Sequence, residues 1–314
     1  MAPTVFIDGE AGTTGLQIRE RLEHRADLTL VSIEADKRKD SDERRRLLNS
    51  ADAVILCLPD EAAKEAVAMI KNDRVKVIDA STAHRVAPDW AYGFAEMSRA
   101  QRAAIAASKR VANPGCYPTG FIALVRPLVE AGIVPRAWPL SVNAVSGYSG
   151  GGKAMIAEFE NEADPSFTRA PYRIYAMAQK HKHVPEMTRY AGLERAPIFQ
   201  PSVGRYYKGM IVEVPLPLSA LPGKPKLTGV QDALASAYAG ERFVSVASLK
   251  EAAALKTLAP EGLNDTNQMK LFVFGHDDEA RLVALLDNLG KGASGAAVQN
   301  LNIMLGLEES AGST

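Results

Sequence analysis

The 314-residue chain is long enough for two domains, and its 46% hydrophobic and 24% charged residues are ordinary for a globular protein. Its 37 basic and 37 acidic residues cancel, which argues against a nucleic-acid binder, because such proteins usually carry a basic excess. No apolar stretch is long enough to span a bilayer, no secretory leader pattern is apparent, and two cysteines do not indicate a disulfide framework. We therefore expect a cytoplasmic protein with neither membrane nor nucleic acid as a partner.

The first 115 residues alternate short apolar runs with segments of helix-forming composition. We expect helices over residues 16–22 and 62–70, and strands over residues 4–8, 28–34, 53–58 and 75–79. These strands are almost continuously apolar, which is typical of a parallel sheet that helices cover on both faces. This part of the chain is therefore predicted to be an α/β domain.

The first predicted strand runs directly into the glycine-rich sequence V-F-I-D-G-E-A-G-T-T-G-L. Its G-x-x-G-x-x-G spacing differs from the G-x-G-x-x-G dinucleotide fingerprint. The physical basis is shared, because glycines allow tight turns and a helix N-terminus offers free N–H groups to a pyrophosphate. A turn without a ligand is the alternative, but the position after a first strand favours a cofactor site. The candidate contacts are Gly9, Gly12, Thr13, Thr14 and Gly15.

The end of the second predicted strand, S-I-E-A-D-K-R-K, leaves the choice between NAD and NADP open. Glu34 or Asp36 is suited to a ribose 2′-hydroxyl, which favours NAD. Lys37, Arg38 and Lys39 are suited instead to a 2′-phosphate, which favours NADP. The residues themselves do not decide between the two cofactors.

Cys116 lies in the sequence V-A-N-P-G-C-Y-P-T-G-F-I. Apolar residues recur at helical spacing after it, and Pro118 suits the first turn of a helix. The pattern places Cys116 at a helix N-terminus, where unpaired N–H groups stabilise a thiolate and lower the thiol pKa. We interpret Cys116 as a reactive thiol, and Cys57, inside an apolar strand, as a packing residue.

A second glycine-rich loop, V-S-G-Y-S-G-G-G-K, runs from Val145 to Lys153 between a strand-like run and a helical stretch. Its hydroxyl groups and backbone amides are suited to a phosphate or an oxyanion. A flexible linker is the alternative. The two serines, Ser146 and Ser149, favour an anion-binding loop.

Two of the five histidines, His181 and His183, lie close together in H-K-H-V-P-E. Further ligands are not apparent nearby, so no metal site is predicted. A neutral histidine is a suitable base beside a catalytic thiol. In an extended chain the two side chains face opposite sides, so we expect only one to reach Cys116. If the following turn is helical, Glu186 shares a face with His183 and orients its ring. An exposed pair without a function is the alternative.

The later part of the chain has the pattern of a mostly antiparallel sheet, with expected strands over residues 210–216, 242–247, 269–274 and 281–287. Residues alternate in the first of these, and its prolines suggest an edge or a strand end. Residues 295–307 are predicted to form a helix. The last residues, E-E-S-A-G-S-T, are expected to be disordered.

Four blocks of the sequence resemble the successive signature blocks of the N-acetyl-gamma-glutamyl-phosphate reductase family in its shorter form. They are N-P-G-C-Y-P-T, S-G-Y-S-G-G-G-K, H-K-H-V-P-E and N-L-G-K-G-A-S-G-A-A-V-Q-N. This family belongs to the semialdehyde dehydrogenase superfamily. The resemblance implies an α/β fold with a Rossmann-type NADP-binding domain over residues 1–115. It further implies an inserted α+β catalytic and oligomerisation domain over 116–290, and a C-terminal helix over 291–314 that returns to the nucleotide domain.

The resemblance also implies a reaction, which is the NADPH-dependent reduction of an acyl phosphate to a semialdehyde through a thioester, in arginine biosynthesis. Cys116 would be the nucleophile, His183 the acid/base group, and His181 a contact of the substrate carboxylate. The cofactor contacts would be Gly9, Gly12, Thr13, Thr14, Gly15, Arg38, Ser81 and Asn300, with Asn300 near the nicotinamide. Ser149 and Gly150 would serve the acyl phosphate.

Two other functions fit parts of the sequence. An aspartate-semialdehyde dehydrogenase would use the same chemistry on a shorter substrate. A non-catalytic NADP-binding regulator would keep the glycine loop but would not need the Cys116 block or the two histidines. The expected ligand is a small acyl phosphate, and the expected assembly is a homodimer or a homotetramer.

Overall fold

The computed structural model describes residues 2–38 and 40–313 of the chain. The chain forms two compact units, each described by itself below. The first unit comprises Met1–Ala95, Arg99–Pro114 and Ala293–Thr314, and the second comprises Glu96–Ser98 and Gly115–Gly292. The C-terminal segment therefore folds with the N-terminal one.

The first unit contains a six-stranded parallel sheet in the order β2-β1-β3-β4-β6-β5. Its strands are β1 (Thr4–Asp8), β2 (Thr29–Val31), β3 (Ala53–Leu56), β4 (Lys76–Asp79), β5 (Ala91–Tyr92) and β6 (Arg110–Ala112). The chain runs from β1 to β2 on one side and returns to β3 on the other, so the strand order reverses between β1 and β3. In doubly wound sheets such a reversal opens a ligand-binding crevice at the carboxyl ends of the strands.

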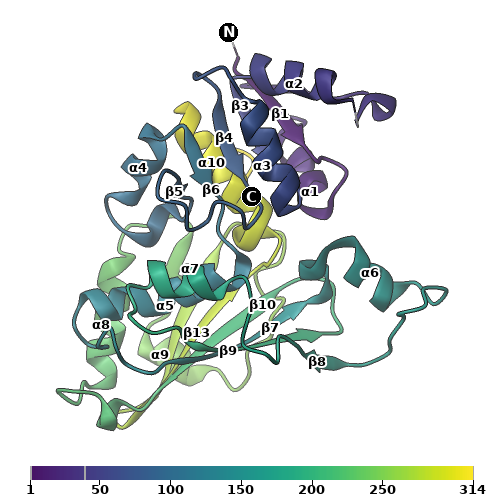
Figure 1. Ribbon diagram of the computed structural model, residues 1–314. Helices are drawn as coiled ribbons and strands as arrows, with labels where there is room; N and C mark the ends of the chain where they lie inside the picture. The colour runs from purple at the N-terminus through teal and green to yellow at the C-terminus, as the bar shows by residue number, and fades with distance from the viewer. Residues whose placement is uncertain (1, 39, 314) are drawn as a thin grey trace. The chain divides into compact units, whose positions relative to one another are not determined.

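Helices cover both faces of this sheet, as its apolar strands require (Figure 1). Val5 and Ile7 pack on the face covered by α1 (Thr13–Leu22), α4 (Gln101–Ala107) and α10 (Gly295–Leu305). Phe6, between them in sequence, packs on the face covered by α2 (Ser41–Ser50) and α3 (Asp60–Met69). One strand thus supplies two cores, because its successive side chains point to opposite faces. The predicted α/β architecture is confirmed.

Two predicted strands of the first unit end earlier than expected. β2 ends at Val31 and β3 at Leu56, three and two residues before the predicted ends. After β2, the Ser32 hydroxyl accepts a hydrogen bond from the Arg19 side chain, and Ala35–Lys37 forms a 3-10 turn. After β3, Pro59 has no N–H for a strand ladder and instead begins α3 as its N-cap.

The second unit contains a seven-stranded mixed sheet in the order β11-β12-β13-β10-β7-β9-β8. Four of its pairings are antiparallel, while β7 with β9 and β11 with β12 are parallel. The strands are β7 (Ser141–Gly147), β8 (Tyr172–Ile174), β9 (Ile198–Gly204), β10 (Met210–Leu216), β11 (Val244–Val246), β12 (Met269–His276) and β13 (Glu279–Leu286). The predicted strand at 210–216 is confirmed, and the mostly antiparallel character holds.

One face of this second sheet is covered by helices. Helix α5 (Cys116–Glu130) lies on β10 and β13 and also contacts α7 (Val184–Tyr190) and α8 (Leu227–Ala237), while α8 lies on β11 and β12. A Cβ on Gly120 would lie 2.9 Å from a Val212 methyl group, so α5 packs close to the strand. The remaining helices are α6 (Gly152–Glu160) and α9 (Leu249–Ala254). The opposite face of the sheet is covered only in part, by a small cluster around α9.

The C-terminal residues are more ordered than predicted. Helix α10 ends at Leu305 because Gly306 adopts a left-handed conformation, with φ 69°. The chain then folds back, and Asn302 Nδ2 donates to the Ala311 oxygen at 2.8 Å. Glu309 forms an ion pair with Arg102 at 2.9 Å. The expectation of disorder was therefore wrong for 308–313, because polar contacts on the first unit hold this segment.

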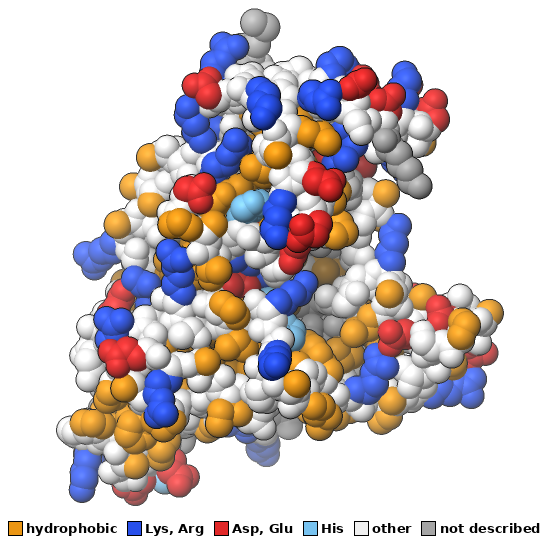
Figure 2. Space-filling view, in the orientation of Figure 1, with side chains coloured by type: hydrophobic (Ala, Val, Ile, Leu, Met, Phe, Trp, Pro, Cys, Tyr) orange, Lys and Arg blue, Asp and Glu red, His pale blue; other side chains and the backbone are white. Residues whose placement is uncertain are grey.

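No helix in the described ranges is long and apolar enough to cross a membrane. On the face of the molecule shown in Figure 2, basic and acidic side chains are interspersed. This mixture agrees with the balanced charge of the sequence.

Candidate active site

The glycine-rich loop after β1 is constrained at two of its glycines. Gly9 has φ +90°, and a Cβ there would lie 2.4 Å from the carbonyl oxygen of Cys57, just after β3. At Gly15 a Cβ would lie 2.5 Å from the Gly9 oxygen. The Gly12 N–H closes the turn by donating to the same Gly9 oxygen at 3.0 Å. Gly9 and Gly15 are therefore required by the packing of the loop itself.

Gly12 is different, because a Cβ there would meet no neighbour closer than 3.4 Å. Packing therefore does not require glycine at this position. Gly12 is the N-cap of α1, whose first turn carries Thr13 and Thr14 and has no side-chain cap. The N–H groups of an uncapped first turn are available to an anion. The loop thus leaves a bare helix N-terminus at the point where the strand order reverses.

Two arginines meet one carboxylate between the glycine loop and the end of β2. Glu10, which is 8% exposed, accepts from Arg19 Nη1 at 2.6 Å and from Arg38 Nη2 at 3.4 Å. Arg19 Nη1 also donates to Ser32 Oγ at 2.7 Å. The arginine side chains are 38% and 46% exposed, so Glu10 holds both guanidinium groups while other N–H donors stay accessible.

The other candidates at the end of β2 are placed differently. The Glu34 side chain is 70% exposed and pairs with Lys37 at 2.7 Å. The bond to Glu34 raises the pKa of the Lys37 ammonium. Lys39 lies outside the described residues. Arg38 contacts the glycine loop through Glu10, and Ser32 is the residue that directly follows β2.

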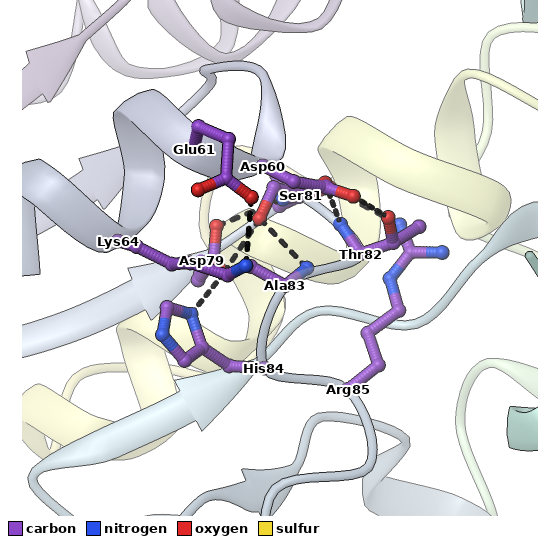
Figure 3. A network of polar contacts seen from close by, with 10 residues as sticks. Asp60, Glu61, Lys64, Asp79, Ser81, Thr82, Ala83, His84 and Arg85 are labelled. Carbon is purple, nitrogen blue, oxygen red and sulfur yellow. Dashed lines mark hydrogen bonds and ion pairs between the residues drawn. The ribbon is translucent and has the colours of Figure 1, made fainter.

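A polar network holds the loop after β4 (Figure 3). The buried Asp79 carboxylate accepts from the Ser81 N–H at 2.9 Å and from the Ser81 hydroxyl at 2.8 Å. His84 Nδ1 contacts the same carboxylate at 2.6 Å, and its ring stacks on Trp90 with centroids 4.2 Å apart. Thr82 donates its N–H to Asp60 at 2.9 Å. Because the Ser81 proton is directed at Asp79, the Ser81 oxygen can only accept from a ligand.

Asn300 lies in α10 and is fully buried within the first unit. Its Nδ2 donates to the Gly93 oxygen at 2.9 Å and to Asn113 Oδ1 at 3.1 Å. Asn113 in turn donates to the Ala293 oxygen at 2.9 Å. These amides tie the C-terminal helix to the segments after β5 and β6. The role of Asn300 near a nicotinamide stays a prediction.

Cys116 is the first residue of α5, and Gly115 is the N-cap. The Gly115 N–H donates to Glu186 Oε2 at 3.0 Å, and Glu186 is 1% exposed. The half-buried Cys116 therefore stands at the positive end of a 15-residue helix, on a backbone that a buried carboxylate anchors. The predicted helix start is confirmed. The role of Glu186 in orienting His183 stays a prediction.

Cys57 has the opposite surroundings. It follows β3, and burial together with the Asp79 and Asp8 carboxylates raises the pKa of its thiol to about 12. A thiol with so high a pKa stays protonated at neutral pH and is a poor nucleophile. The two free cysteines of the chain are thus chemically distinct.

The two histidines lie together, contrary to the expectation that they face opposite sides. Their ring centroids are 4.6 Å apart, and both approach the Tyr117 ring, at 6.2 Å for His181 and 5.8 Å for His183. The prediction assumed an extended chain, whereas this segment turns into α7 with His183 as its N-cap. The His183 N–H donates to His181 Nδ1 at 3.1 Å. A neutral His181 therefore carries its proton on Nε2 and presents a donor there.

A pair of tyrosine hydroxyls lies beside the histidines. Tyr175 donates to the Tyr117 hydroxyl at 3.0 Å, and Tyr117 donates to the Ser202 oxygen at 3.1 Å. Burial raises the pKa of Tyr117, which keeps its hydroxyl protonated. Ala176 next to Tyr175 has φ +56°, a left-handed conformation that is strained for alanine. Aromatic and imidazole groups thus surround the residue next to Cys116.

The serine-glycine loop connects β7 to α6. Ser149 is 1% exposed, and its Oγ accepts from Asn288 Nδ2 at 3.1 Å. Gly150 is exposed, and α6 begins at Gly152 without a side-chain cap. Lys153 in the first turn is also exposed. The accessible part of the loop therefore consists of backbone amides and one ammonium group, whereas the Ser149 hydroxyl is buried.

Sequence reasoning did not single out several residues that contact the predicted site residues. Glu10 and Arg19 pair near Arg38, Tyr117 contacts both histidines, and Gly292 lies against Cys116. Glu10 could have been noticed in the sequence, because an acidic residue is unexpected inside a loop that is predicted to bind an anion. Within the described part of the chain, no cluster of three or more His, Cys, Asp or Glu side chains is arranged to hold a metal ion.

Comparison with known proteins gives consistent matches over nearly the whole chain. Residues 4–105 match the family described as semialdehyde dehydrogenase, NAD binding domain, and residues 116–288 match semialdehyde dehydrogenase, dimerisation domain. An N-acetyl-gamma-glutamyl-phosphate reductase of Sinorhizobium medicae is 57% identical over 308 residues, covering 97% of this chain and 99% of the relative. One of Brucella anthropi is 57% identical over 309 residues, covering 98% of this chain and 99% of the relative.

Solved structures with the same fold are more distant in sequence. Aspartate semialdehyde dehydrogenase II of Vibrio cholerae, complexed with ASA, has a TM-score of 0.73 at 15% identity, covering 97% of this chain and 98% of that one. Aspartate semialdehyde dehydrogenase of Candida albicans, with NADP, has a TM-score of 0.64 at 13% identity, covering 97% and 99%. At such identities the likeness concerns the fold.

Proposed function

The chain belongs to the N-acetyl-gamma-glutamyl-phosphate reductase family of semialdehyde dehydrogenases, and we propose that the residues described above carry out that family's reaction. The enzyme reduces N-acetyl-gamma-glutamyl phosphate with NADPH to N-acetylglutamate 5-semialdehyde and releases phosphate, in arginine biosynthesis. The observation that supports this most directly is the half-buried Cys116 at the N-terminus of α5, beside the cluster of Tyr117, His181 and His183.

The chemistry at Cys116 proceeds in two stages. The thiolate attacks the acyl carbon, and the bond to the phosphate oxygen breaks, which leaves a thioester and free phosphate. NADPH, when bound, supplies the hydride that reduces this thioester. The resulting hemithioacetal oxyanion expels the Cys116 thiolate as the aldehyde forms. Backbone N–H donors near Cys116 stabilise the oxyanions of both stages, worth about 3–4 kcal/mol per donor in comparable sites.

His183 acts as the proton donor and acceptor, with Glu186 as a supporting carboxylate, and His181 holds the substrate carboxylate. The His181 role is supported by the bond from the His183 backbone N–H to Nδ1, which places the proton of a neutral ring on Nε2 as a donor. The phosphate group is bound by the loop of Ser149 and Gly150. The exposed amide of Gly150 suits this role better than the buried Ser149 hydroxyl, which acts through the shape of the loop.

The first unit fits NADP at three places. The uncapped N-terminus of α1 suits the pyrophosphate, with contacts from Gly9, Gly12, Thr13, Thr14 and Gly15. Packing within the protein does not require glycine at position 12, but a closely bound ligand would. Ser32, in place of an acidic residue after β2, and the nearby Arg38 suit a 2′-phosphate. Ser81 offers an acceptor, and we place Asn300 near the nicotinamide. These roles correspond to the proposed domains, which are the NADP-binding domain over 1–115, the catalytic domain over 116–290 and the C-terminal helix over 291–314.

We expect Arg38→Ala to raise the Michaelis constant for NADPH far more than that for NADH. The substitution removes a charge-assisted contact of roughly 1.5–3 kcal/mol, which corresponds to about ten-fold or more. Steady-state kinetics with both cofactors measure the effect. Arg45→Ala serves as the control, because Arg45 pairs with Asp42 on the surface of α2. Equal effects of Arg38→Ala on the two cofactors would assign Arg38 to the solvated surface.

The substrate is tested by phosphate-dependent NADP reduction with N-acetylglutamate semialdehyde and, separately, with aspartate semialdehyde. Preference for the first aldehyde supports the proposed function. Preference for the second would make the protein an aspartate-semialdehyde dehydrogenase. NADP binding without turnover of either aldehyde would favour a non-catalytic regulator. We place this activity in the cytoplasm, where both cysteines can stay reduced.

A second copy of the chain is the proposed partner, and the partly covered face of the second sheet is the proposed contact. Tyr172, Ile174 and Ile198 lie on this face by strand alternation and are 56%, 58% and 57% exposed. The same face has two hollows, with volumes of about 610 Å³ and 300 Å³, that share Glu213 and Arg281. A sheet face that exposes several large apolar side chains suits a homodimer, or a homotetramer built from dimers.

We expect Ile198→Asp to convert the dimer into monomers, because it places a charge among the exposed apolar side chains of the proposed contact. Analytical ultracentrifugation measures the mass. Ala235→Asp is the control, since Ala235 is exposed on α8, which covers the opposite face of the sheet. An unchanged dimer of the folded Ile198→Asp protein would place the interface elsewhere.

A further inference from the structure

The turn between β13 and α10, Asp287–Gly292, contributes Lys291 to a buried ion pair with Glu96, which the chemistry above does not use. Lys291 Nζ lies 2.8 and 2.9 Å from the two carboxylate oxygens of Glu96. The two side chains are 2% and 0% exposed. The ammonium also lies 5.4 Å from the centre of the Phe243 ring. Burial of a lysine ammonium is unfavourable unless a carboxylate and other contacts compensate for the lost hydration. A charged pair at this buried place therefore calls for a functional explanation.

The residue next to Lys291 touches the nucleophile. A Cβ on Gly292 would lie 2.7 Å from the Cys116 Cβ and 3.3 Å from its Cα. The Gly292 N–H donates to the Asp287 oxygen at 3.0 Å, which closes the turn behind Cys116. Residues Gly290–Ser294 form a short π-helix, a form found often at functional sites. A shift of Lys291 would therefore move Gly292, the neighbouring residue against which Cys116 packs.

The same turn also holds the serine-glycine loop. Asn288 Oδ1 accepts from the Gly209 N–H at 2.7 Å, and its Nδ2 donates to Ser149 Oγ at 3.1 Å. Gly209 lies opposite Gly147 in the adjoining strand and accepts its N–H at 2.9 Å. The turn thus lies against Cys116 and is hydrogen-bonded to the loop assigned to the phosphate. These two groups must act on neighbouring atoms of one acyl phosphate.

We propose that Glu96 and Lys291 are positioning residues, which act through Gly292 on Cys116 and through Asn288 on Ser149. The assignment of the phosphate loop rests on the proposed function. The action on the thiol does not, because it follows from the contact between Gly292 and Cys116. The pair fixes the turn in one place, so that the thiol and the phosphate loop keep the spacing that the substrate requires. Small displacements of reacting groups are known to lower rates by about 100-fold.

The first test replaces both charges, with Glu96→Gln and Lys291→Met together, so that no unpaired charge stays buried. We expect the folded variant to show a kcat lower by about 100-fold with an unchanged Michaelis constant for NADPH. We also expect the pH profile of Cys116 alkylation by iodoacetamide to shift, measured without substrate in a Cys57→Ala background. Lys226→Met is the control, because Lys226 pairs with Asp277 at the surface. Normal kcat and a normal alkylation profile in the folded double variant would overturn the proposal.

The second test leaves the ion pair intact and changes the contact between Gly292 and Cys116 directly. Gly292→Ala adds a methyl group against Cys116, and we expect the same loss of kcat and the same altered alkylation profile. Gly229→Ala is the matched control, since a Cβ there meets no atom within 4 Å. If the double variant does not fold, this test decides, and normal alkylation in Gly292→Ala would overturn the proposal. Alkylation needs no substrate, so its outcome is separate from any failure of the assigned reaction.

Discussion

Replacement of Cys116 by alanine is expected to abolish turnover, with a loss of about 10⁴-fold or more, because no other group can form the thioester. In the proposed mechanism Cys116 at the α5 N-terminus attacks as a thiolate, and alanine offers no electron pair to the acyl carbon. NADPH affinity should persist, since the glycine loop, Arg38 and Ser81 belong to the first unit and Cys116 to the second. Steady-state rates and NADPH fluorescence titration measure the two properties.

Cys57→Ala is the matched control for this experiment. Its thiol pKa is raised to about 12, chiefly by burial, so the thiol is protonated at neutral pH and contributes no nucleophile. The variant should keep its activity. If two folded single variants lost activity equally, without a change in cofactor affinity, the chemical distinction between the cysteines would be wrong.

Replacement of His183 by asparagine is expected to lower the maximal rate by about 100- to 10,000-fold, the usual range for general acid–base help. His183 is 7% exposed and approaches Tyr117, the residue after the proposed nucleophile Cys116. Loss of the imidazole should also change the pH at which iodoacetamide alkylates Cys116. Rapid-quench kinetics and alkylation rates measure the two effects.

His181→Asn is the companion variant, and it should mainly weaken the binding of N-acetylglutamate semialdehyde. The His183 N–H occupies His181 Nδ1, which suits His181 to hold a carboxylate through Nε2–H. The reverse pattern of effects would exchange the two roles. If neither variant altered the rate or the thiol reactivity, the pair would be structural and another group would be the base.

Local features of the active site were predictable because each is encoded in a short segment. The helix start at Cys116 follows from the Gly-Cys-Tyr-Pro sequence and the helical apolar spacing after it. The turn at Gly9 and the helix after it follow from the glycine spacing and the preceding apolar strand. The parallel sheet follows from apolar strands that alternate with helices. In the first two cases the residues that carry the signal also form the structure, so no distant partner is needed.

The failures have the opposite cause. The two histidines were expected to face opposite sides, but the start of α7 turns the chain and brings the rings together. The C-terminal residues were expected to be disordered, yet Asn302 and Arg102 bind them. For the C-terminal residues a contact outside the segment decided the conformation, whereas for the histidines the assumption of an extended chain overlooked the helix that starts at Val184. A short or polar segment lacks the apolar periodicity from which its conformation could have been predicted.

Only the tertiary structure decided which distant residues complete the site. Glu186 lies 71 residues from Gly115, and Asn288 lies 139 residues from Ser149, yet each pair is joined by a hydrogen bond. Gly292 lies against Cys116 because α5 and the turn after β13 meet within the second unit. The sequence by itself determined the strand–helix alternation of the first unit, the helix start at Cys116 and the family. The positions of the supporting groups required the fold, because side-chain contacts between remote segments depend on how the sheets and helices pack, and no local period records that.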